Sequence, residues 1–277
     1  MGVGLLLALY NANTTTDWVR VAHAAARIPI RAIVPVDGVS PPDPDWAPDF
    51  PTADAFRKGV QMLRNAGVET AAYAHLRNIS RQCCTCCGNL TQFATWVDLV
   101  QATGIDTMML DNLDAPWSST QPYHPDGLHE MYVPAVEELR RRKMGVWANG
   151  PHVLSDGSVE NASLWQEYLG LSSFTTLFEI SYDNWLHGAS TDYAAALHWP
   201  KEKLGGYVLD LPDNTTAAAP LIDASLRAAR DRGLTWLYPT VKCKHGTGPH
   251  QGSCTYADLP SYFDALVDAV ERLGAED

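Results

Sequence analysis

The sequence predicts an α/β fold, a single (β/α)8 TIM-type barrel over residues 1–277. Three observations predict it. Short apolar runs rich in β-branched or aromatic residues alternate eight times with longer segments of helical period. The connections from helix to strand are short, whereas those from strand to helix are long. The chain has 277 residues, which is the size of one such barrel.

The alternation gives each element in order. The expected strands are residues 4–10, 30–36, 69–75, 107–111, 145–149, 175–180, 206–210 and 235–240. The expected helices are residues 17–26, 53–66, 92–103, 130–143, 162–170, 191–197, 217–232 and 256–273. Gly67 and Gly233 each follow a helix and precede a strand, where a left-handed helix end fits glycine. No G-x-G-x-x-G motif follows the first strand, so the sequence does not support dinucleotide binding.

The long strand-to-helix connections carry the cysteines. They are Cys83, Cys84, Cys86, Cys87, Cys243 and Cys254. Cysteines in loops and in even number indicate disulfides and an oxidising compartment. A zinc site is the alternative, but four cysteines within five consecutive residues can hardly surround one tetrahedral ion. We therefore expect loops stapled by disulfides, in which Cys243 and Cys254 would close a small loop.

Other features of the composition bear on location and partners. N-x-S/T sequons stand at Asn13, Asn78, Asn89, Asn161 and Asn214. They predict a secreted glycoprotein, although some of these residues could simply cap helices. Residues 2–10 read as a first strand rather than a signal peptide, and no apolar run suggests a membrane span. The formal net charge of −12 argues against nucleic acid or an anionic membrane as partner and allows a neutral or cationic one. We expect a monomer.

Two carboxylates follow unusually apolar strands. Asp111 ends the run 107–110, and Glu179 ends the run 176–178. An ionisable group at such a place is costly unless it is exposed at the mouth of the barrel or paired. By strand count they lie on the fourth and sixth strands, and alternate strands share an inward layer. The pair could flank a glycosidic bond, one as acid and the other as nucleophile or base. Alternatively, each carboxylate pairs with a barrel cation or caps a helix.

Further polar and aromatic residues fall near the same strand ends and are candidates to contact a substrate. They are Tyr10, Asp37, His75, Asn112, Trp117, Asn149, Tyr182, Trp185 and Asp210. Flat aromatic faces can stack on sugar rings, which favours carbohydrate as the partner. Asp37 and Asp210 could equally serve turn chemistry, and Trp147 is expected in the core. No metal or cofactor is implied.

Several motifs follow one another along the chain: residues 5–10, Ala32-Ile33-Val34-Pro35, residues 63–68, Ala72-Tyr73-Ala74, residues 104–111, Trp147-Ala148-Asn149-Gly150 and residues 177–182. In these motifs and their order, the chain resembles the spherulin-4-like proteins. The resemblance implies a secreted (β/α)8 glycoside hydrolase, and characterised fungal members cleave α-linked, galactosamine-containing exopolysaccharide. It implies catalytic roles for Asp111 and Glu179.

One position departs from the family pattern. The family has an Asp-Glu pair at the end of the fourth strand, and here Asn112 follows Asp111. Asparagine cannot ionise or transfer a proton. Asp114, two residues further on, could reach back. The leading hypothesis is a retaining hydrolase, in which the roles of Asp111 and Glu179 could be exchanged. The alternatives are a carbohydrate-binding barrel disabled at Asn112, and a disulfide-stapled structural protein without a ligand.

Overall fold

The computed structural model describes residues 2–9, 15–34, 53–75, 90–111, 132–149, 169–187, 192–241 and 259–276. Within these ranges eight parallel strands form a closed barrel in sequence order, because β1 pairs with both β2 and β8. The strands are β1 (Gly4–Ala8), β2 (Ile30–Val34), β3 (Glu69–His75), β4 (Thr107–Asp111), β5 (Gly145–Asn149), β6 (Phe174–Ser181), β7 (Leu204–Leu211) and β8 (Trp236–Val241). The predicted (β/α)8 class is confirmed.

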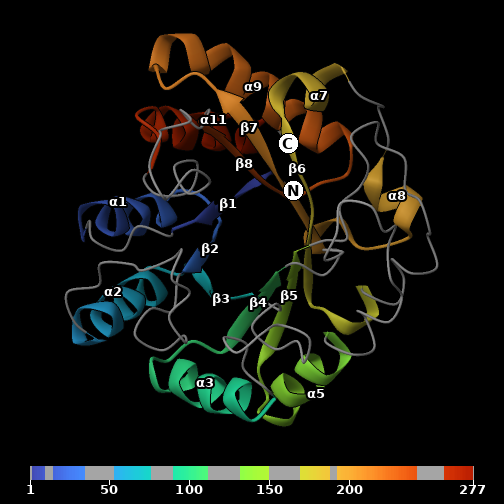
Figure 1. Cartoon of the computed structure of the whole chain (residues 1–277). Helices are drawn as coiled ribbons and strands as arrows, with labels where there is room; N and C mark the ends of the chain where they lie inside the picture. Colours follow the sequence, from blue (N-terminus) through green and yellow to red (C-terminus); the bar gives the residue numbers. More distant parts are fainter. Residues whose placement is uncertain are drawn as a thin grey trace, which may run out of the picture.

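Helices surround the strands in a ring (Figure 1). They are α1 (Thr15–Ala25), α2 (Ala53–Asn65), α3 (Leu90–Ala102), α5 (Val133–Arg141), α7 (Tyr182–His187), α8 (Tyr193–Leu197), the 3-10 turn η3 (Lys201–Lys203), α9 (Thr215–Asp231) and α11 (Phe263–Ala275). Each of the longer ones buries an apolar stripe, as α9 does with Ile222, Leu226 and Ala229. The short α7 was not predicted, and most of the expected helix at 162–170 lies outside the described residues.

The predicted left-handed glycines are confirmed. Gly67 has φ +86° after α2, and Gly233 has φ +67° after α9. Beyond Gly233, the Leu234 amide donates to the Ala229 carbonyl at 2.9 Å, so a carbonyl group in the last turn of α9 accepts a hydrogen bond. Lys143 adopts φ +59° at the corresponding place between α5 and β5. A side chain in this conformation costs about 1 kcal/mol relative to glycine.

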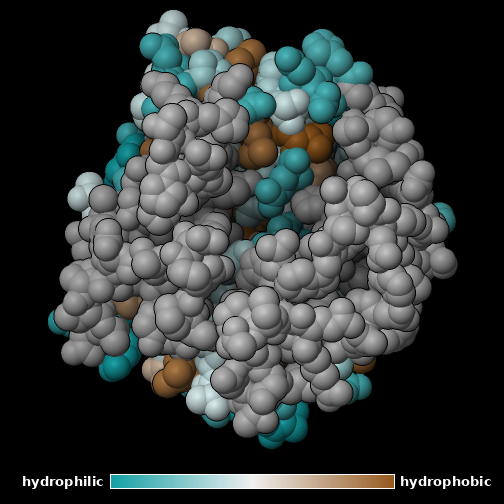
Figure 2. Space-filling model, in the orientation of Figure 1, coloured by the Kyte–Doolittle hydropathy of each residue, from teal (hydrophilic) through white to brown (hydrophobic). Residues whose placement is uncertain are grey.

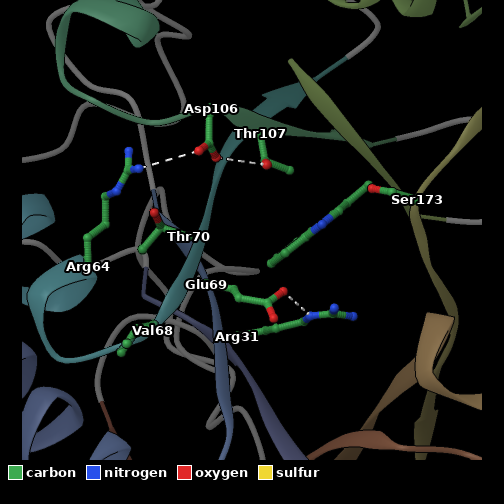
Figure 3. Close-up of a pocket in the computed structure, with 10 residues that line it drawn as sticks. Arg31, Arg64, Val68, Glu69, Thr70, Asp106, Thr107 and Ser173 are labelled. Carbon is green, nitrogen blue, oxygen red and sulfur yellow. Dashed lines mark hydrogen bonds and ion pairs between the residues drawn. The ribbon is translucent and has the colours of Figure 1, made fainter. Parts of the chain in front are cut away.

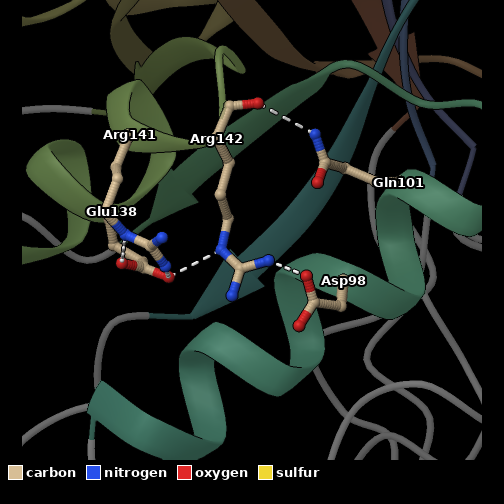
Figure 4. Close-up of polar contacts among 5 residues, drawn as sticks. All are labelled: Asp98, Gln101, Glu138, Arg141 and Arg142. Atoms are coloured by element: carbon tan, nitrogen blue, oxygen red, sulfur yellow. Dashed lines mark hydrogen bonds and ion pairs between the residues drawn. The ribbon is translucent and has the colours of Figure 1, made fainter.

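The outer layer is also held by charged contacts. Between α3 and α5, Arg142 forms an ion pair with Asp98 and donates from Nε to Glu138 at 2.6 Å (Figure 4). Gln101 on α3 donates to the Arg142 carbonyl at 3.0 Å. These contacts clamp the end of α5 against α3, directly before the chain enters β5.

Arg31 lies partly buried at the amino-terminal end of the barrel. Its guanidinium lies 4.3 Å from the ring centroid of Trp236 and 4.7 Å from that of Phe174, and Nε donates to Glu69 at 2.7 Å. A guanidinium stacks well on aromatic faces, so this cation is accommodated without being exposed. Trp147 is 4% exposed and contacts Phe174, which confirms its expected place in the core.

Several predicted features lie outside the described residues. All six cysteines and the sequons at Asn13, Asn78, Asn89 and Asn161 lie outside the described residues. Asn214 is exposed, and its side chain caps α9 by accepting from the Ala217 amide at 3.1 Å. None of the helices in the described ranges combines the length and the hydropathy needed to cross a membrane.

Candidate functional site

Asp111 and Glu179 come together at the carboxyl ends of β4 and β6. Asn149, at the end of β5 between them, donates from Nδ2 to Asp111 Oδ1 at 2.7 Å and to Glu179 Oε1 at 3.1 Å. The accepting oxygens are therefore at most about 6 Å apart, the sum of these two lengths. Both carboxylates are partly buried, whereas Asn149 is only 4% exposed. In the space-filling view, hydrophilic residues appear near the centre of the face that is shown (Figure 2).

The local backbone explains how Glu179 reaches this place. The register between β6 and β7 shifts between Thr176 and Glu179, as in a β-bulge. A bulge re-aims the side chains that follow it and is common beside active sites. The preceding residues Leu177 and Phe178 are both buried in apolar contacts. The strand therefore fixes Glu179 firmly while the bulge directs it toward the barrel axis.

Tyr73 also contacts Asp111. Its hydroxyl donates to Asp111 Oδ2 at 2.5 Å, so each oxygen of this carboxylate accepts a hydrogen bond. Donors of this kind stabilise the ionised form of a carboxylate. The sequence did not single out Tyr73, although it lies two residues before His75 and hence on the same face of β3. His75 is the register partner of Asp111.

Tyr207 on β7 flanks Glu179 from the other side. It is 1% exposed and is the register partner of Glu179 and of Tyr238 on β8. Burial, and next the charge of Glu179, raise the pKa of the Tyr207 phenol well above its usual value, with a smaller contribution from Asp111. The phenol is therefore neutral at any physiological pH. The sequence did not identify it, because a tyrosine inside a strand reads as core.

The structure corrects one predicted contact. Trp185 was expected to line the site, but it is fully buried on α7. Its ring stacks on Phe178 at 4.9 Å, and its indole N–H donates to the Ser225 carbonyl of α9 at 3.2 Å. The unpredicted helix α7 turns this side chain back into the layer between the barrel and α9.

Of the remaining predicted substrate contacts, some are described by the structure and others lie outside the described residues. Tyr182 is partly buried at the start of α7, and burial raises the pKa of its phenol. Asp210 is exposed at the end of β7 with φ +71°, within a register shift between Val208 and Leu211. Tyr10, Asp37, Asn112 and Trp117 lie outside the described residues, as does the side chain of His75.

A cavity of about 500 Å³ lies at the opposite end of the barrel. It is lined by the starts of β3 and β4, and Figure 3 shows its charged side chains facing one another. Arg31 pairs with Glu69 at 2.7 Å and Arg64 with Asp106 at 3.4 Å. Since this end of a (β/α)8 barrel serves stability and these charges compensate one another, we place the chemistry at the carboxylates instead.

The described residues contain no group of three His, Cys, Asp or Glu side chains arranged to hold a metal ion. The site that they do contain is a pair of carboxylates flanked by neutral donors. Such a pair can transfer protons or attack a carbon centre.

Comparison with solved structures shows the same fold. The broad-specificity endoglucanase GH5-4 from Clostridium longisporum matches with a TM-score of 0.54 and 13% identity over 99% of this chain and 97% of that one. The D-allulose 3-epimerase from Methylomonas sp. matches with a TM-score of 0.54 and 10% identity over the whole of both chains. PbGH5A, a glycoside hydrolase family 5 enzyme from Prevotella bryantii B14, matches with a TM-score of 0.52 and 13% identity over 97% and 96%.

No curated protein matches the sequence. The family model of spherulation-specific family 4, Spherulin4, matches residues 4–270. This match covers all eight strands, including those that carry Asp111, Asn149 and Glu179. The chain belongs to spherulation-specific family 4.

Proposed function

We propose that the barrel is a glycoside hydrolase that cleaves O-glycosidic bonds with retention of configuration at the anomeric carbon. The observation that carries this proposal is the attachment of Asp111 and Glu179 to one nitrogen of Asn149. Retaining enzymes hold their two carboxyl groups about 5–5.5 Å apart, and inverting enzymes about 6.5–9.5 Å. The upper limit of about 6 Å between the bonded oxygens favours retention.

The hydrogen bonds also suggest a division of roles. Asp111 accepts hydrogen bonds on both oxygens, which hold its carboxylate in a fixed orientation for attack as the nucleophile. Glu179 then serves as acid and base. Its proton passes to the glycosidic oxygen as an Asp111 oxygen attacks the anomeric carbon, and the bond to the leaving sugar breaks. Water, deprotonated by Glu179, next cleaves the bond between sugar and Asp111, so that both residues regain their starting forms.

The substrate in this proposal is an α-linked polysaccharide that contains galactosamine or N-acetylgalactosamine. The family resemblance suggests it, and the net charge of −12 suits a polymer that is neutral or carries amino groups. The structural neighbours named above include an endoglucanase and a sugar epimerase, so sugar chemistry is common on this fold. Asp210, near the end of β7, and Tyr182, at the start of α7, are proposed to contact the polymer.

The same proposal covers the cellular setting of the protein. The loop cysteines and the sequons support a secreted, disulfide-stapled glycoprotein that acts as a monomer outside the cell. Reducing and non-reducing mass spectrometry of the protein from a eukaryotic host would test this part. Six free thiols and an unmodified mass would contradict it.

A second candidate function is carbohydrate binding without cleavage. It is favoured by Asn112, which stands where the family has glutamate and cannot transfer a proton. If that glutamate takes part in proton transfer, the carboxylate pair alone would bind sugar but turn it over slowly or not at all.

One experiment separates the two candidates. The protein is incubated with α- and β-linked amino-sugar polymers, and new reducing ends are measured for the wild type, Asp111→Asn, Glu179→Gln and Asn112→Glu. Hydrolysis by the wild type that both neutral variants abolish supports the enzyme. Binding without cleavage by the wild type, together with cleavage by Asn112→Glu, supports the binding protein. Neither binding nor cleavage with any polymer would contradict both.

A further inference from the structure

Asp111 is held from both neighbouring strands, and the two donors bind different oxygens of its carboxylate. β4 lies between β3 and β5 in the barrel. Asn149 on β5 donates to Oδ1 at 2.7 Å and also reaches Glu179. The hydroxyl of Tyr73 on β3 donates to Oδ2 at 2.5 Å. Oδ1 is therefore the oxygen that shares a donor with Glu179, whereas Oδ2 is bound from the other side of β4.

The strand register explains why a tyrosine at position 73 reaches Asp111. Tyr73 is the register partner of Met109, which lies two residues before Asp111 on β4. Because alternate residues of a strand face the same side, Tyr73 and Asp111 point to one face, and the long phenol spans the offset between them. The tyrosine ring is partly buried and packs against the core, so its hydroxyl is held at Oδ2. Phenylalanine would fill the same volume without a donor.

The charge on Oδ2 changes in opposite directions in the two steps of the proposed reaction. When Oδ1 attacks the anomeric carbon, the carboxylate of Asp111 becomes an ester, and Oδ2 becomes its carbonyl oxygen. When water then attacks that carbon, the bond to Oδ1 breaks, its electron pair returns to Asp111, and Glu179 takes the proton of the water. A hydrogen bond to an ionised acceptor is stronger than one to a neutral carbonyl. The hydrogen bond from Tyr73 thus weakens in the first step and strengthens in the second.

We propose that Tyr73 is a positioning residue for the second step, in which its hydroxyl stabilises Asp111 as that residue leaves the sugar as a carboxylate. The inference rests on the proposed function, because it needs a covalent intermediate at Asp111. An interaction speeds a step only if it is stronger in the transition state than in the state before it. Tyr73 therefore speeds the release of the sugar from Asp111 and not its attachment. It forms no bond with the substrate and transfers no proton.

Steady-state and burst kinetics of Tyr73→Phe separate the two steps. The probe is the 4-nitrophenyl α-glycoside of an α-linked galactosamine trisaccharide, whose good leaving group makes the first step fast. We expect kcat to fall about tenfold, because the second step loses a hydrogen bond to a charged group. KM should fall with it as the intermediate accumulates, so that kcat/KM stays nearly constant, and a burst of 4-nitrophenol should precede the steady state. Tyr262→Phe removes a buried hydroxyl at the start of α11 and should leave both constants unaltered.

A second replacement keeps both the ring and the hydroxyl, so it tests the donor without removing it. Fluorine makes a phenol more acidic and hence a stronger hydrogen-bond donor. Replacing Tyr73 by 3-fluorotyrosine should therefore raise kcat about twofold with this probe and leave kcat/KM unchanged. Mass spectrometry of quenched reactions should find the sugar attached to Asp111 in Tyr73→Phe and no adduct in Asp111→Asn.

The wild type distinguishes failure of this proposal from failure of the proposed function. If the wild type hydrolyses the probe while Tyr73→Phe lowers kcat and kcat/KM equally, without a burst or an adduct, Tyr73 has only a structural role and the proposal is overturned. A kcat that 3-fluorotyrosine leaves unchanged would overturn it as well. If the wild type cleaves neither the probe nor any α-linked amino-sugar polymer, the hydrolase function itself is contradicted, and the role of Tyr73 with it.

Discussion

Asp111 and Glu179 accept hydrogen bonds from the same nitrogen atom, Nδ2 of Asn149, at 2.7 and 3.1 Å. This relationship defines the site, because two carboxylates that share one donor are held at a separation that neither strand alone would set. It also fixes the orientation of the amide, since the reverse orientation would point the amide oxygen at two acceptors.

Activity should therefore depend on the hydrogen-bond donor of Asn149 more than on the volume of its side chain. Asn149→Asp places a third acceptor between Asp111 and Glu179, and we expect kcat/KM to fall by at least about 100-fold because charges so close repel strongly. Asn65→Asp, on the exposed end of α2, makes the same chemical change outside the site and should leave activity unaltered. Steady-state kinetics of the two variants test this prediction. Equal activities would show that the hydrogen bonds from Asn149 do not hold the two carboxylates in their active arrangement.

Asp210 allows a test of substrate contact that separates charge from backbone conformation. Asp210→Asn keeps a side chain that tolerates φ +71°, while Asp210→Gly relieves the conformation entirely. If the carboxylate binds an amino-sugar polymer, both variants raise KM several-fold, and Asp210→Gly in addition raises Tm slightly. An unchanged KM in both, measured with the same polymer, would assign Asp210 to turn chemistry alone.

The positive φ of Lys143 predicts that glycine at this position would stabilise the protein, at a site remote from the carboxylates. Lys143→Gly removes the cost of φ +59° at an exposed helix end, and we expect about 1 kcal/mol of stabilisation, or a rise in Tm of about 2–3 °C. Glu137→Gly, in the exposed interior of α5, should instead lower Tm by a similar amount. Thermal unfolding followed by circular dichroism gives both values. A lower Tm for Lys143→Gly would show that its side chain stabilises the loop.

The buried phenols predict how stability depends on pH. Burial is the largest cause of the raised pKa of Tyr207, Tyr238 and Tyr262. In the unfolded chain each phenol loses its proton near pH 10, whereas in the folded state it keeps the proton at higher pH. Stability is therefore unaffected below about pH 10 and falls above it, by about 1.4 kcal/mol per pH unit for each phenol.

Denaturant unfolding between pH 9 and pH 11 measures this slope. Tyr238→Phe removes one titrating group and should make the alkaline decline shallower, even if the variant is less stable at neutral pH. A slope equal to that of the wild type would mean that Tyr238 ionises equally readily in the folded and unfolded chains.

Much of the fold was predictable because the strands are bounded by strong local signals. The expected and observed limits of β3, β4 and β5 coincide, since each apolar run begins after a glycine or a polar pair and ends on a polar residue. Gly67 and Gly233 were recognisable because only glycine adopts a positive φ without cost. Lys143 carried no such signal, because lysine is not a residue that marks a left-handed helix end.

The site was predictable only in part. The ends of β4 and β6 identified Asp111 and Glu179, because carboxylates after apolar strands stand out. The sequence placed Asn149 at the mouth but could not show that it bridges two carboxylates, since side-chain distances across three strands depend on barrel geometry. Tyr73 and Tyr207 were missed for the opposite reason, as buried aromatic residues within strands look like ordinary core.

The central claim is that the carboxylate pair cleaves a glycosidic bond with retention, and the configuration of the first product tests it most directly. Proton NMR of a fresh reaction with an α-linked amino-sugar oligomer distinguishes the anomers before mutarotation. The Asp111–Asn149–Glu179 geometry predicts that the α-anomer appears first and that Asp111→Asn forms no product. The β-anomer appearing first, or no cleavage of any such oligomer by the wild type, would contradict the account.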